Sequence, residues 1–486
     1  MSSNTDNRKL SHNSADAQQA SDREPARTRT RTRRPRSGDP GRRARTSASS
    51  QRQRVRSQAR ASAAQAPASR TSDARASAAQ SVGKKPSASL LKIIILLIIA
   101  AAVLVFAISR IGACAKEAWE TAKYAHAHVS FIAVGDNLPD YGIGDEADAK
   151  AGEMDDGKYD YHFIFEHIAP YSQAADIAYI NQETHIGGDV IGPKGYPSFN
   201  TTDEMADAVV DAGFDFVASA TNHSYDWGYY GALAHSREVW SEKPVKFTGT
   251  ARSQEEADEI VTITCNGMTF SLLDYTYGVN GCDVGEDFEP YEINLIDEDR
   301  IRADVARAKE MSDVVIVAMH WGTENQTEPD DDQLYYAQLL ADLDVDLVLG
   351  SHPHVIGPLA WVQGASGHRT LVAYSLGNFV SNHETPAPLN ELEGMLSCEF
   401  VRDNDIITIE NIEWIPLVNH TEEGVHTVYA LPDYKRDIAA RHIFLKELDD
   451  PVGWLGDTSA SIVNSLGGDF AIRLPQKEEQ HANNAG

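Results

Sequence analysis

Cysteine is scarce in this chain, with only four among 486 residues. Four cysteines are too few to hold a protein of this size together by disulfide bonds, which excludes a disulfide-rich scaffold. Cys265 and Cys282 can pair if this part of the chain is exported, but their positions alone do not require it.

Aromatic and large aliphatic residues are nearly missing from residues 1–86, which consist mainly of Arg, Ser, Ala, Thr, Gln and Pro. Such a segment cannot bury enough apolar surface to offset the entropy of ordering, so we predict a disordered arm over residues 1–86. Acidic residues are also rare there, with 6 Asp and Glu against 20 Lys and Arg, whereas the chain after Arg110 carries a net charge of −45. The chain therefore combines a basic arm with a strongly acidic body.

A long apolar run separates the arm from the body. From Leu90 to Ile108 the only polar residue is Lys92, and 19 residues at about 1.5 Å each are enough to cross a bilayer as a helix. We predict a transmembrane signal-anchor helix over residues 87–110. Because positive charge stays in the cytoplasm, the arm is expected inside and the rest of the chain outside.

Two other readings of this region are weaker. A cleaved signal peptide does not fit, because the segment before the apolar run is far too long. The tetrapeptide IGAC, ending at Cys114, looks like a lipidation site, but Arg110 separates it from the apolar run. An arm that binds nucleic acid would have to act alone inside the cell, so no nucleic-acid partner is expected, whereas attraction to anionic lipid fits a segment beside a membrane.

After a juxtamembrane linker over residues 111–128, short apolar runs alternate with longer helical stretches. This pattern is typical of α/β proteins, in which helices cover the sheets. We expect the main domain over residues 129–440 and a C-terminal extension with a polar tail over residues 441–486. The expected strands are residues 129–135, 176–181, 214–220, 245–250, 261–276, 313–320, 347–351 and 370–379, with further strands at 395–402, 406–417 and 425–431. The expected helices are residues 202–212, 228–240, 299–311 and 330–343.

Residues of the types that bind metal ions follow several of these expected strands. Carboxyl ends of strands hold loop residues rigidly, and α/β enzymes place their chemistry there. The candidate metal ligands are Asp136, Glu183, Asn222, His320, His352 and His354. Each is weak evidence alone, because an Asp or His after a strand is usually a turn or capping residue. Together they offer oxygen and imidazole ligands without a thiolate, which suits two divalent ions of the Mn²⁺, Fe²⁺ or Zn²⁺ kind.

The segment GSHPHV, residues 350–355, places two of these histidines on either side of Pro353. Taken alone, His352 and His354 can equally be turn residues. If they are ligands, we expect Pro353 to keep the chain extended so that both imidazoles point into one cleft. Asn280 with Gly281, and Asn378, are interpreted as turn residues rather than ligands.

The order and spacing of the motifs resemble a known family, the bacterial capsule synthesis protein CapA family, also called the poly-γ-glutamate biosynthesis protein family, within the calcineurin-like metallophosphatases. The matching motifs are VGD (134–136), NQE (181–183), TNHSYDWGYYGA (221–232), YTYGVNG (275–281), HWGTE (320–324), GSHPHV (350–355) and YSLGNFVSN (374–382). The resemblance covers residues 130–417 and implies a metallophosphatase-like four-layer α/β/β/α sandwich.

The same resemblance implies roles for the candidate residues. Asp136, Glu183 and His354 would hold one metal ion, and Glu183 would share a second ion with Asn222, His320 and His352, although which of His352 and His354 serves which ion stays open. His223 would be the general acid for the leaving group, oriented by Asp226. The first motif lacks the second-position histidine of the wider superfamily, and NQE replaces its bridging aspartate motif.

The resemblance implies a membrane-anchored protein of the cell envelope that acts in making, exporting or anchoring a capsule-type polymer such as poly-γ-glutamate. Metal-assisted hydrolysis of a phosphoester or an amide is the expected reaction. The alternative is a non-catalytic accessory subunit that binds the polymer or a membrane synthase partner. The acidic excess argues against tight binding of a polyanion except through metal ions.

Overall fold

The structure is a computed structural model of the full chain, and it describes residues 87–281, 288–382 and 387–475. The predicted disordered arm, the polar tail after residue 475 and Cys282, with which Cys265 could pair, lie outside the described residues. Of the described cysteines, Cys265 and Cys398 are free thiols.

Helix α1 (Ala88–Lys123) contains the predicted transmembrane segment. Its part Ala88–Ala113 is long and apolar enough to cross a membrane, and none of its most apolar stretch is buried against protein. The helix continues well beyond residue 110, so most of the predicted linker over residues 111–128 is helical.

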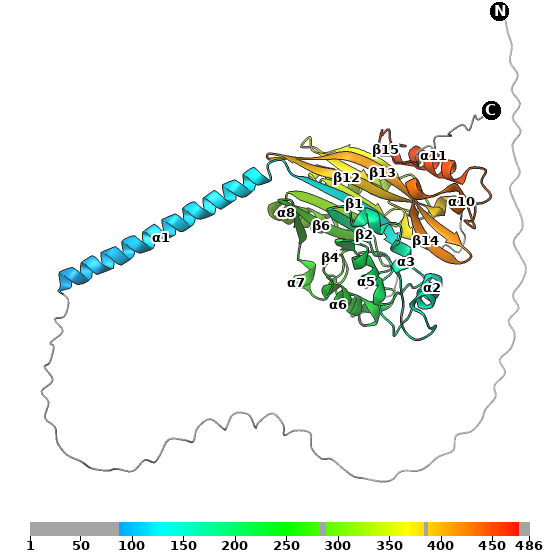
Figure 1. Cartoon of the computed structure of the whole chain (residues 1–486), viewed down its shortest axis with the longest axis horizontal. Coiled ribbons are helices and arrows are strands. Elements are labelled where there is room, and N and C mark those ends of the chain that lie inside the picture. Colours follow the sequence, from blue (N-terminus) through cyan, green and yellow to red (C-terminus); the bar gives the residue numbers. More distant parts are fainter. Residues whose placement is uncertain (1–86, 282–287, 383–386, 476–486) are drawn as a thin grey trace, which may run out of the picture. The chain divides into compact units, whose positions relative to one another are not determined.

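Two β-sheets form the body of the protein (Figure 1). The larger sheet has the order β14-β13-β12-β1-β2-β3-β4, with β11 beside β1 and β15 beside β13. Its strands are β1 (His128–Asn137), β2 (Ile177–Asn181), β3 (Phe216–Ala218), β4 (Lys246–Thr248), β11 (Asn378–Val380), β12 (Leu392–Asp403), β13 (Ile406–Glu422), β14 (Val425–Ala430) and β15 (Ala471–Ile472). The smaller sheet has the order β5-β6-β7-β8-β10-β9. Its strands are β5 (Val261–Cys265), β6 (Met268–Thr276), β7 (Val314–His320), β8 (Leu347–Ser351), β9 (Leu359–Gln363) and β10 (Arg369–Ala373).

Helices and helical turns connect these strands. The described ones after α1 are α2 (Tyr141–Ala151), α3 (His162–Phe165), α4 (Ala169–Ser172), α5 (Glu204–Asp211), the π-helical turn η1 (Tyr229–Leu233), α6 (Ala234–Ser241), α7 (Gln254–Ala257), α8 (Glu298–Met311), α9 (Asp331–Asp342), the 3-10 turns η2 (Pro388–Glu391) and η3 (Leu431–Asp433), α10 (Arg436–Ala439) and α11 (Pro451–Val463). Helix α9 begins at a capping box, in which Asp330 and Gln333 each accept a hydrogen bond from the other's backbone N–H.

The alternation of side chains along the strands creates four layers. On β1, Phe131 faces the core between the two sheets, whereas Ile132 packs with helices α2, α3 and α5. On β7, Ile316 faces the same central core, whereas Val315 packs with helices α8 and α9. Because successive residues of a strand point to opposite faces, each sheet has one face on the other sheet and one under helices. The predicted α/β/β/α sandwich is confirmed.

Two expected strands are each divided in the structure. The segment predicted as one strand over residues 261–276 is a hairpin of β5 and β6, which turns at Asn266 and Gly267, both with positive φ. The Asn-Gly pair is a strong hairpin signal that the sequence interpretation overlooked. The segment predicted over residues 370–379 contains β10 and then β11, which joins the other sheet.

The central core continues past residue 440, where the predicted domain 129–440 ends. Leu445, Val452, Leu455 and Val463 are buried and pack in the same cluster as Trp414. Helix α11 therefore belongs to the folded body rather than to a C-terminal extension separate from it.

Asp274 on β6, in the smaller sheet, contacts the larger sheet just after the end of β3. Its Oδ2 accepts hydrogen bonds from the backbone N–H groups of Ser219 and Ala220, each at 2.7 Å, and its side chain is buried.

We expect Asp274→Ala to lower the free energy of unfolding by about 2–5 kcal/mol, because two buried N–H groups lose their acceptor. Denaturant unfolding of the full-length chain in detergent measures this. Asp274→Asn keeps an oxygen acceptor and should retain most of the stability, and equal stability of all three proteins would contradict the role of this contact.

Glu391 is a buried carboxyl group whose ionisation opposes folding. Burial raises its pKa to about 8, and Oε2 has no hydrogen-bond partner among the described residues. His442 lies 3.7 Å away, but burial lowers its pKa to about 3, so it offers no positive charge at neutral pH.

The raised pKa of Glu391 predicts a loss of stability as pH rises. Between its ordinary value of 4.5 and about 8, the folded chain keeps a proton that the unfolded chain has released. Each pH unit in this window costs up to about 1.4 kcal/mol. We expect Glu391→Gln to reduce the decline in the free energy of unfolding between pH 6.5 and pH 8, measured by thermal unfolding. Parallel pH profiles of the variant and the wild type would contradict a protonated Glu391.

Candidate metal centre

The carboxyl ends of strands from both sheets meet at one place and bring the candidate ligands together. Asp136 lies at the end of β1, and Glu183 follows β2 by two residues. His320 is the last residue of β7, and His352 follows β8 directly. Asn222 and His354 complete the set, and all six side chains are buried. Strands β1, β2 and β3 are parallel to one another, as are β6, β7 and β8, so their ends point the same way in each sheet.

The backbones of β1 and of the segment before β11 approach each other closely at this site. Asp136 donates its backbone N–H to the carbonyl oxygen of Gly377 at 3.0 Å. A Cβ atom on Gly135 would lie 1.9 Å from that same oxygen, a distance that no side chain can adopt. Glycine at position 135 is therefore needed for β1 and the segment before β11 to meet at the site.

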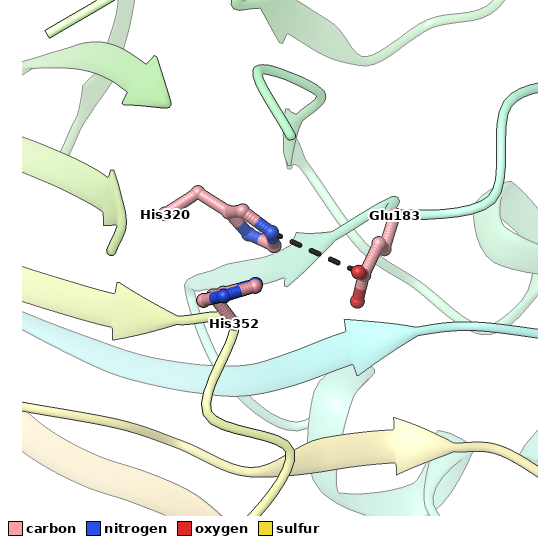
Figure 2. A group of neighbouring side chains, drawn as sticks. All are labelled: Glu183, His320 and His352. Carbon is pink, nitrogen blue, oxygen red and sulfur yellow. Dashed lines mark ion pairs between the residues drawn. The ribbon is translucent and has the colours of Figure 1, made fainter. Parts of the chain in front are cut away.

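Glu183 lies between two groups of side chains, each of which can hold a metal ion: one is Glu183 with His320 and His352, the other Glu183 with Asp136 and His354. Figure 2 shows the first group, with Oε1 of Glu183 3.7 Å from Nε2 of His320. Nδ1 of His354 lies 3.9 Å from Oε2 of Glu183 and 3.7 Å from Oδ2 of Asp136. The two oxygens of Glu183 thus face different groups, as a bridging carboxylate requires.

The chemistry of the buried atoms fits divalent cations. Both oxygens of Glu183 and Nδ1 of His352 are buried without a hydrogen-bond partner among the described residues. Burial and the negative charge of Asp136 raise the pKa of Glu183 well above its usual range. Burial lowers the pKa of His352 to about 3 and that of His320 well below its usual value, so both imidazoles are neutral. Neutral imidazoles and an uncompensated carboxylate are what a metal ion stabilises.

Asn222 contacts the first of these groups. Its Oδ1 lies 2.7 Å from Nε2 of His320, and its Nδ2 donates a hydrogen bond of 3.0 Å to Oδ1 of Asn280. The amide oxygen therefore points to the same region as the oxygens of Glu183.

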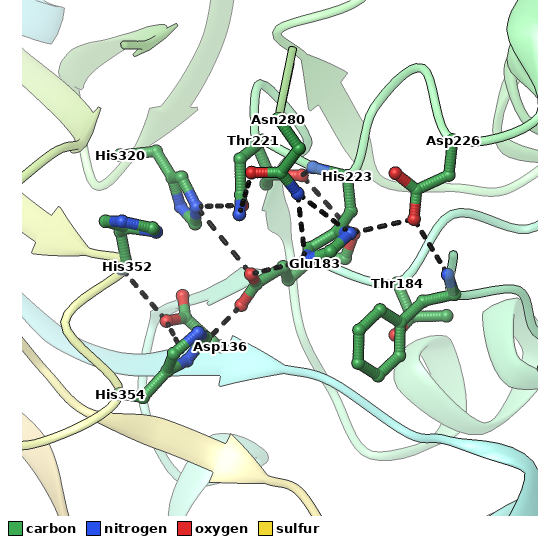
Figure 3. A network of polar contacts seen from close by, with 12 residues as sticks. Asp136, Glu183, Thr184, Thr221, His223, Asp226, Asn280, His320, His352 and His354 are labelled. Atoms are coloured by element: carbon green, nitrogen blue, oxygen red, sulfur yellow. Dashed lines mark hydrogen bonds and ion pairs between the residues drawn. The ribbon is translucent and has the colours of Figure 1, made fainter. Parts of the chain in front are cut away.

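His223 and Asp226 form a pair beside Glu183 (Figure 3). Nδ1 of His223 lies 2.7 Å from Oδ2 of Asp226, and Nε2 lies 3.9 Å from Oε1 of Glu183. Oδ2 of Asp226 also accepts the backbone N–H of Phe199 at 2.7 Å, and the Phe199 ring packs edge-on against the imidazole at 4.7 Å. With Nδ1 held by Asp226, Nε2 is the nitrogen that faces the site.

The segment around Pro353 differs from the expected extended chain. His352 has φ of 95° and His354 has φ of 58°, so both adopt the left-handed region, which is unfavourable for residues with a Cβ atom. The backbone N–H of His352 donates to Oδ2 of Asp136 at 3.0 Å, which helps to hold this conformation. The prediction that Pro353 keeps the chain extended is wrong, because residues 352–355 form bends. The positive φ values of His352 and His354 orient the two imidazoles, and backbone strain of this kind is typical of functional sites.

Three residues at the site were not among the candidate ligands or catalytic residues. Glu324 is exposed and forms a third possible metal-binding group with His352 and His354. Tyr277 packs on the ring of His352, with a centroid distance of 4.6 Å. Asn280 lies with Nδ2 at 3.4 Å from each ring nitrogen of His223. All three belong to the motifs YTYGVNG and HWGTE, which carry the family resemblance. The spacing of residues within these motifs did not indicate that any of the three binds metal or takes part in catalysis.

The fold and the site define a class of protein: two facing sheets covered by helices, with a buried cluster of His, Asp and Glu at the strand ends. The chain belongs to the bacterial capsule synthesis protein family, because the model described as "Bacterial capsule synthesis protein PGA_cap" matches residues 130–383. The expected family membership is confirmed.

Two curated proteins are similar in sequence. The PGA biosynthesis protein CapA of Bacillus subtilis (strain 168) is 28% identical over 224 residues, which cover 45% of this chain and 56% of that protein. The capsule biosynthesis protein CapA of Bacillus anthracis is 26% identical over 234 residues, covering 46% of this chain and 54% of that protein. The chain thus spans about half the length of the curated relatives it matches.

Solved structures with a similar fold are remote in sequence. A putative 5'-nucleotidase from Staphylococcus aureus is 13% identical, with a TM-score of 0.37, over 61% of this chain and 55% of that one. The NAD nucleotidase of Haemophilus influenzae is 10% identical, with a TM-score of 0.35, over 72% of this chain and 58% of that one. These likenesses concern the fold alone.

Proposed function

We propose that this chain is a membrane-anchored hydrolase with two divalent metal ions, which acts in the synthesis, export or anchoring of a capsule or poly-γ-glutamate-type polymer. The observation that carries the proposal is Glu183, a buried carboxylate whose two oxygens lack hydrogen-bond partners among the described residues and face separate ligand groups. Family membership supports the role in capsule synthesis.

The residues divide between the two ions as follows. Asp136, Glu183 and His354 would hold one ion, and Glu183, Asn222, His320 and His352 would hold the other. Bound there, divalent ions would supply an activated water and a positive charge for the leaving oxygen. Mn²⁺, Fe²⁺ and Zn²⁺ all suit this mixture of carboxylate, amide and imidazole ligands.

His223 delivers the proton to the leaving group from Nε2. Asp226 accepts a hydrogen bond of 2.7 Å from Nδ1–H of His223, so the acid form, which is protonated on both ring nitrogens, holds its second proton on Nε2 facing the site. The edge of Phe199 restricts rotation of the same ring. A group held in this way provides general acid catalysis of an ester whose alkoxide leaves poorly.

The bond that is cleaved is a phosphoester of an envelope polymer or lipid-linked intermediate, or an amide of the polymer itself. The body after Arg110 carries −45, so a polyanionic substrate would depend on the metal ions for attraction. Helix α1 anchors the chain in the cell membrane with the N-terminus in the cytoplasm and the metal-binding domain outside.

Hydrolysis assays on the full-length chain in detergent test this proposal. With Mn²⁺ supplied, we expect turnover of a generic phosphodiester or of poly-γ-glutamate, and none by Glu183→Gln purified in parallel. Fewer than one metal ion per chain together with no turnover of either substrate would contradict the hydrolase. Two bound ions without turnover would favour the accessory subunit that binds a polymer or a synthase partner.

Reporter fusions test the topology separately. A reporter active only in the cytoplasm should work at the N-terminus and fail at the C-terminus. An N-terminal fusion that is active only outside the cell would overturn the proposed orientation.

A further inference from the structure

We propose that Asn378 is a fourth protein ligand of the metal ion held by Asp136, Glu183 and His354. This inference rests on the two-metal centre proposed above and completes it. The first ion would otherwise have three protein ligands, whereas the second has four: Glu183, Asn222, His320 and His352.

The sheet places Asn378 directly beside Asp136. Strand β11 pairs with β1 in parallel, and Asp136 and Asn378 are partners in the register. Register partners of parallel strands point their side chains to the same face. Both side chains are fully buried, with Asp136 near the end of β1 and Asn378 at the start of β11, so they face the same region of the site.

The position of the His354 imidazole makes Asn378 a ligand rather than a support. The same nitrogen, Nδ1, lies 2.9 Å from Oδ1 of Asn378, 3.7 Å from Oδ2 of Asp136 and 3.9 Å from Oε2 of Glu183. A metal-binding Nδ1 carries no proton, so it cannot donate a hydrogen bond to Asn378. Two ligand atoms about 2.1 Å from one ion can lie no more than about 4.2 Å apart, and all three separations fall within that limit.

Hydrogen bonds around Asn378 determine which atom of its side-chain amide faces the imidazole of His354. Nδ2 donates to Oγ of Ser381 at 3.0 Å and to the carbonyl oxygen of His354 at 3.4 Å. The backbone N–H of Asn378 donates to Oε2 of the buried Glu393 at 2.6 Å. The amide nitrogen is therefore occupied by two acceptors, and the oxygen is the atom that lies against the His354 imidazole.

The second group has the same construction. There Oδ1 of Asn222 lies 2.7 Å from Nε2 of His320, which in turn lies 3.7 Å from Oε1 of Glu183. In both groups an amide oxygen, an imidazole nitrogen and one oxygen of Glu183 converge.

A thiolate introduced at position 378 gives a direct test by spectroscopy. In full-length Asn378→Cys loaded with Co²⁺, we expect a sulfur-to-cobalt charge-transfer band in the near ultraviolet, because only a coordinating thiolate produces one. Ser381→Cys is the matched control: it places a thiol behind Asn378, one hydrogen bond from the amide, and should produce no such band. Two bound Co²⁺ ions without the band in Asn378→Cys would overturn the proposal.

A binding measurement gives a second, independent test. In Asn378→Leu, one of two Mn²⁺ ions should bind at least about tenfold more weakly while the other is unchanged. Wild-type affinity for both ions in this variant, or fewer than two ions in the wild type, would overturn the proposal. A wild type that binds two ions but hydrolyses nothing would contradict the proposed activity and leave the role of Asn378 intact, so the two failures are distinguishable.

Discussion

Glu183→Gln is expected to remove both metal ions from the protein. The carboxylate is fully buried, and its oxygens face the two groups that contain His320 on one side and His354 on the other. Glutamine keeps the size of the side chain but removes the negative charge and offers only one oxygen. We expect the affinity for each of two Mn²⁺ ions to fall by at least about 100-fold, a loss at the upper end of what supporting residues alone produce. Isothermal titration of the full-length chain in detergent measures both affinities.

Glu391→Gln provides the matched control. It changes another buried glutamate to glutamine, and Glu391 belongs to none of the metal-binding groups among the described residues. This variant should bind both ions as the wild type does. If Glu183→Gln loses only one ion and binds the other with unchanged affinity, Glu183 is not a bridge between the two.

His223→Ala is expected to slow hydrolysis without releasing metal. General acid catalysis contributes roughly 100- to 10,000-fold, and this contribution depends on how poorly the leaving group departs. We therefore expect kcat to fall in this range for an ester of an alkyl alcohol and to change little for an ester of a nitrophenol. The comparison of kcat for the two esters, with metal content measured on the same samples, tests the role.

Asp226→Asn separates orientation from proton transfer. It keeps the imidazole but weakens the contact at Nδ1, 2.7 Å in the wild type, so its loss on the alkyl ester should be smaller than that of His223→Ala. Equal rates of His223→Ala and wild type on the alkyl ester would remove His223 from the acid role. Loss of metal from His223→Ala would make it a ligand instead.

The fold was largely predictable because its strands are short apolar runs between turn residues. Strand β7 is buried along its whole length and reads as a continuous apolar segment, as expected for a parallel strand covered on both faces. The hairpin between β5 and β6 was missed because its two strands read as one apolar run, although Asn266 and Gly267 mark the turn. The path of β11 could not be predicted, since its pairing with β1 joins residues far apart in the chain.

The site was predictable where ligands follow strands in sequence. His320 and Asp136 lie at strand ends, so the rule that places chemistry at these ends selected them. Asn378 begins a strand instead, and only its register with Asp136 brings it to the site. The left-handed conformation of His352 is accompanied by a backbone contact to Asp136, which no local pattern around Pro353 reveals.

The central claim is that two metal ions share Glu183, and electron paramagnetic resonance of the Mn²⁺-loaded full-length chain tests it most directly. Two Mn²⁺ ions about 3.5–4 Å apart with a bridging carboxylate are magnetically coupled. We predict the spectrum of a coupled pair at two ions per chain, and its loss in Glu183→Gln. The signal of isolated Mn²⁺ ions at full loading, or fewer than two bound ions in the wild type, would contradict the account.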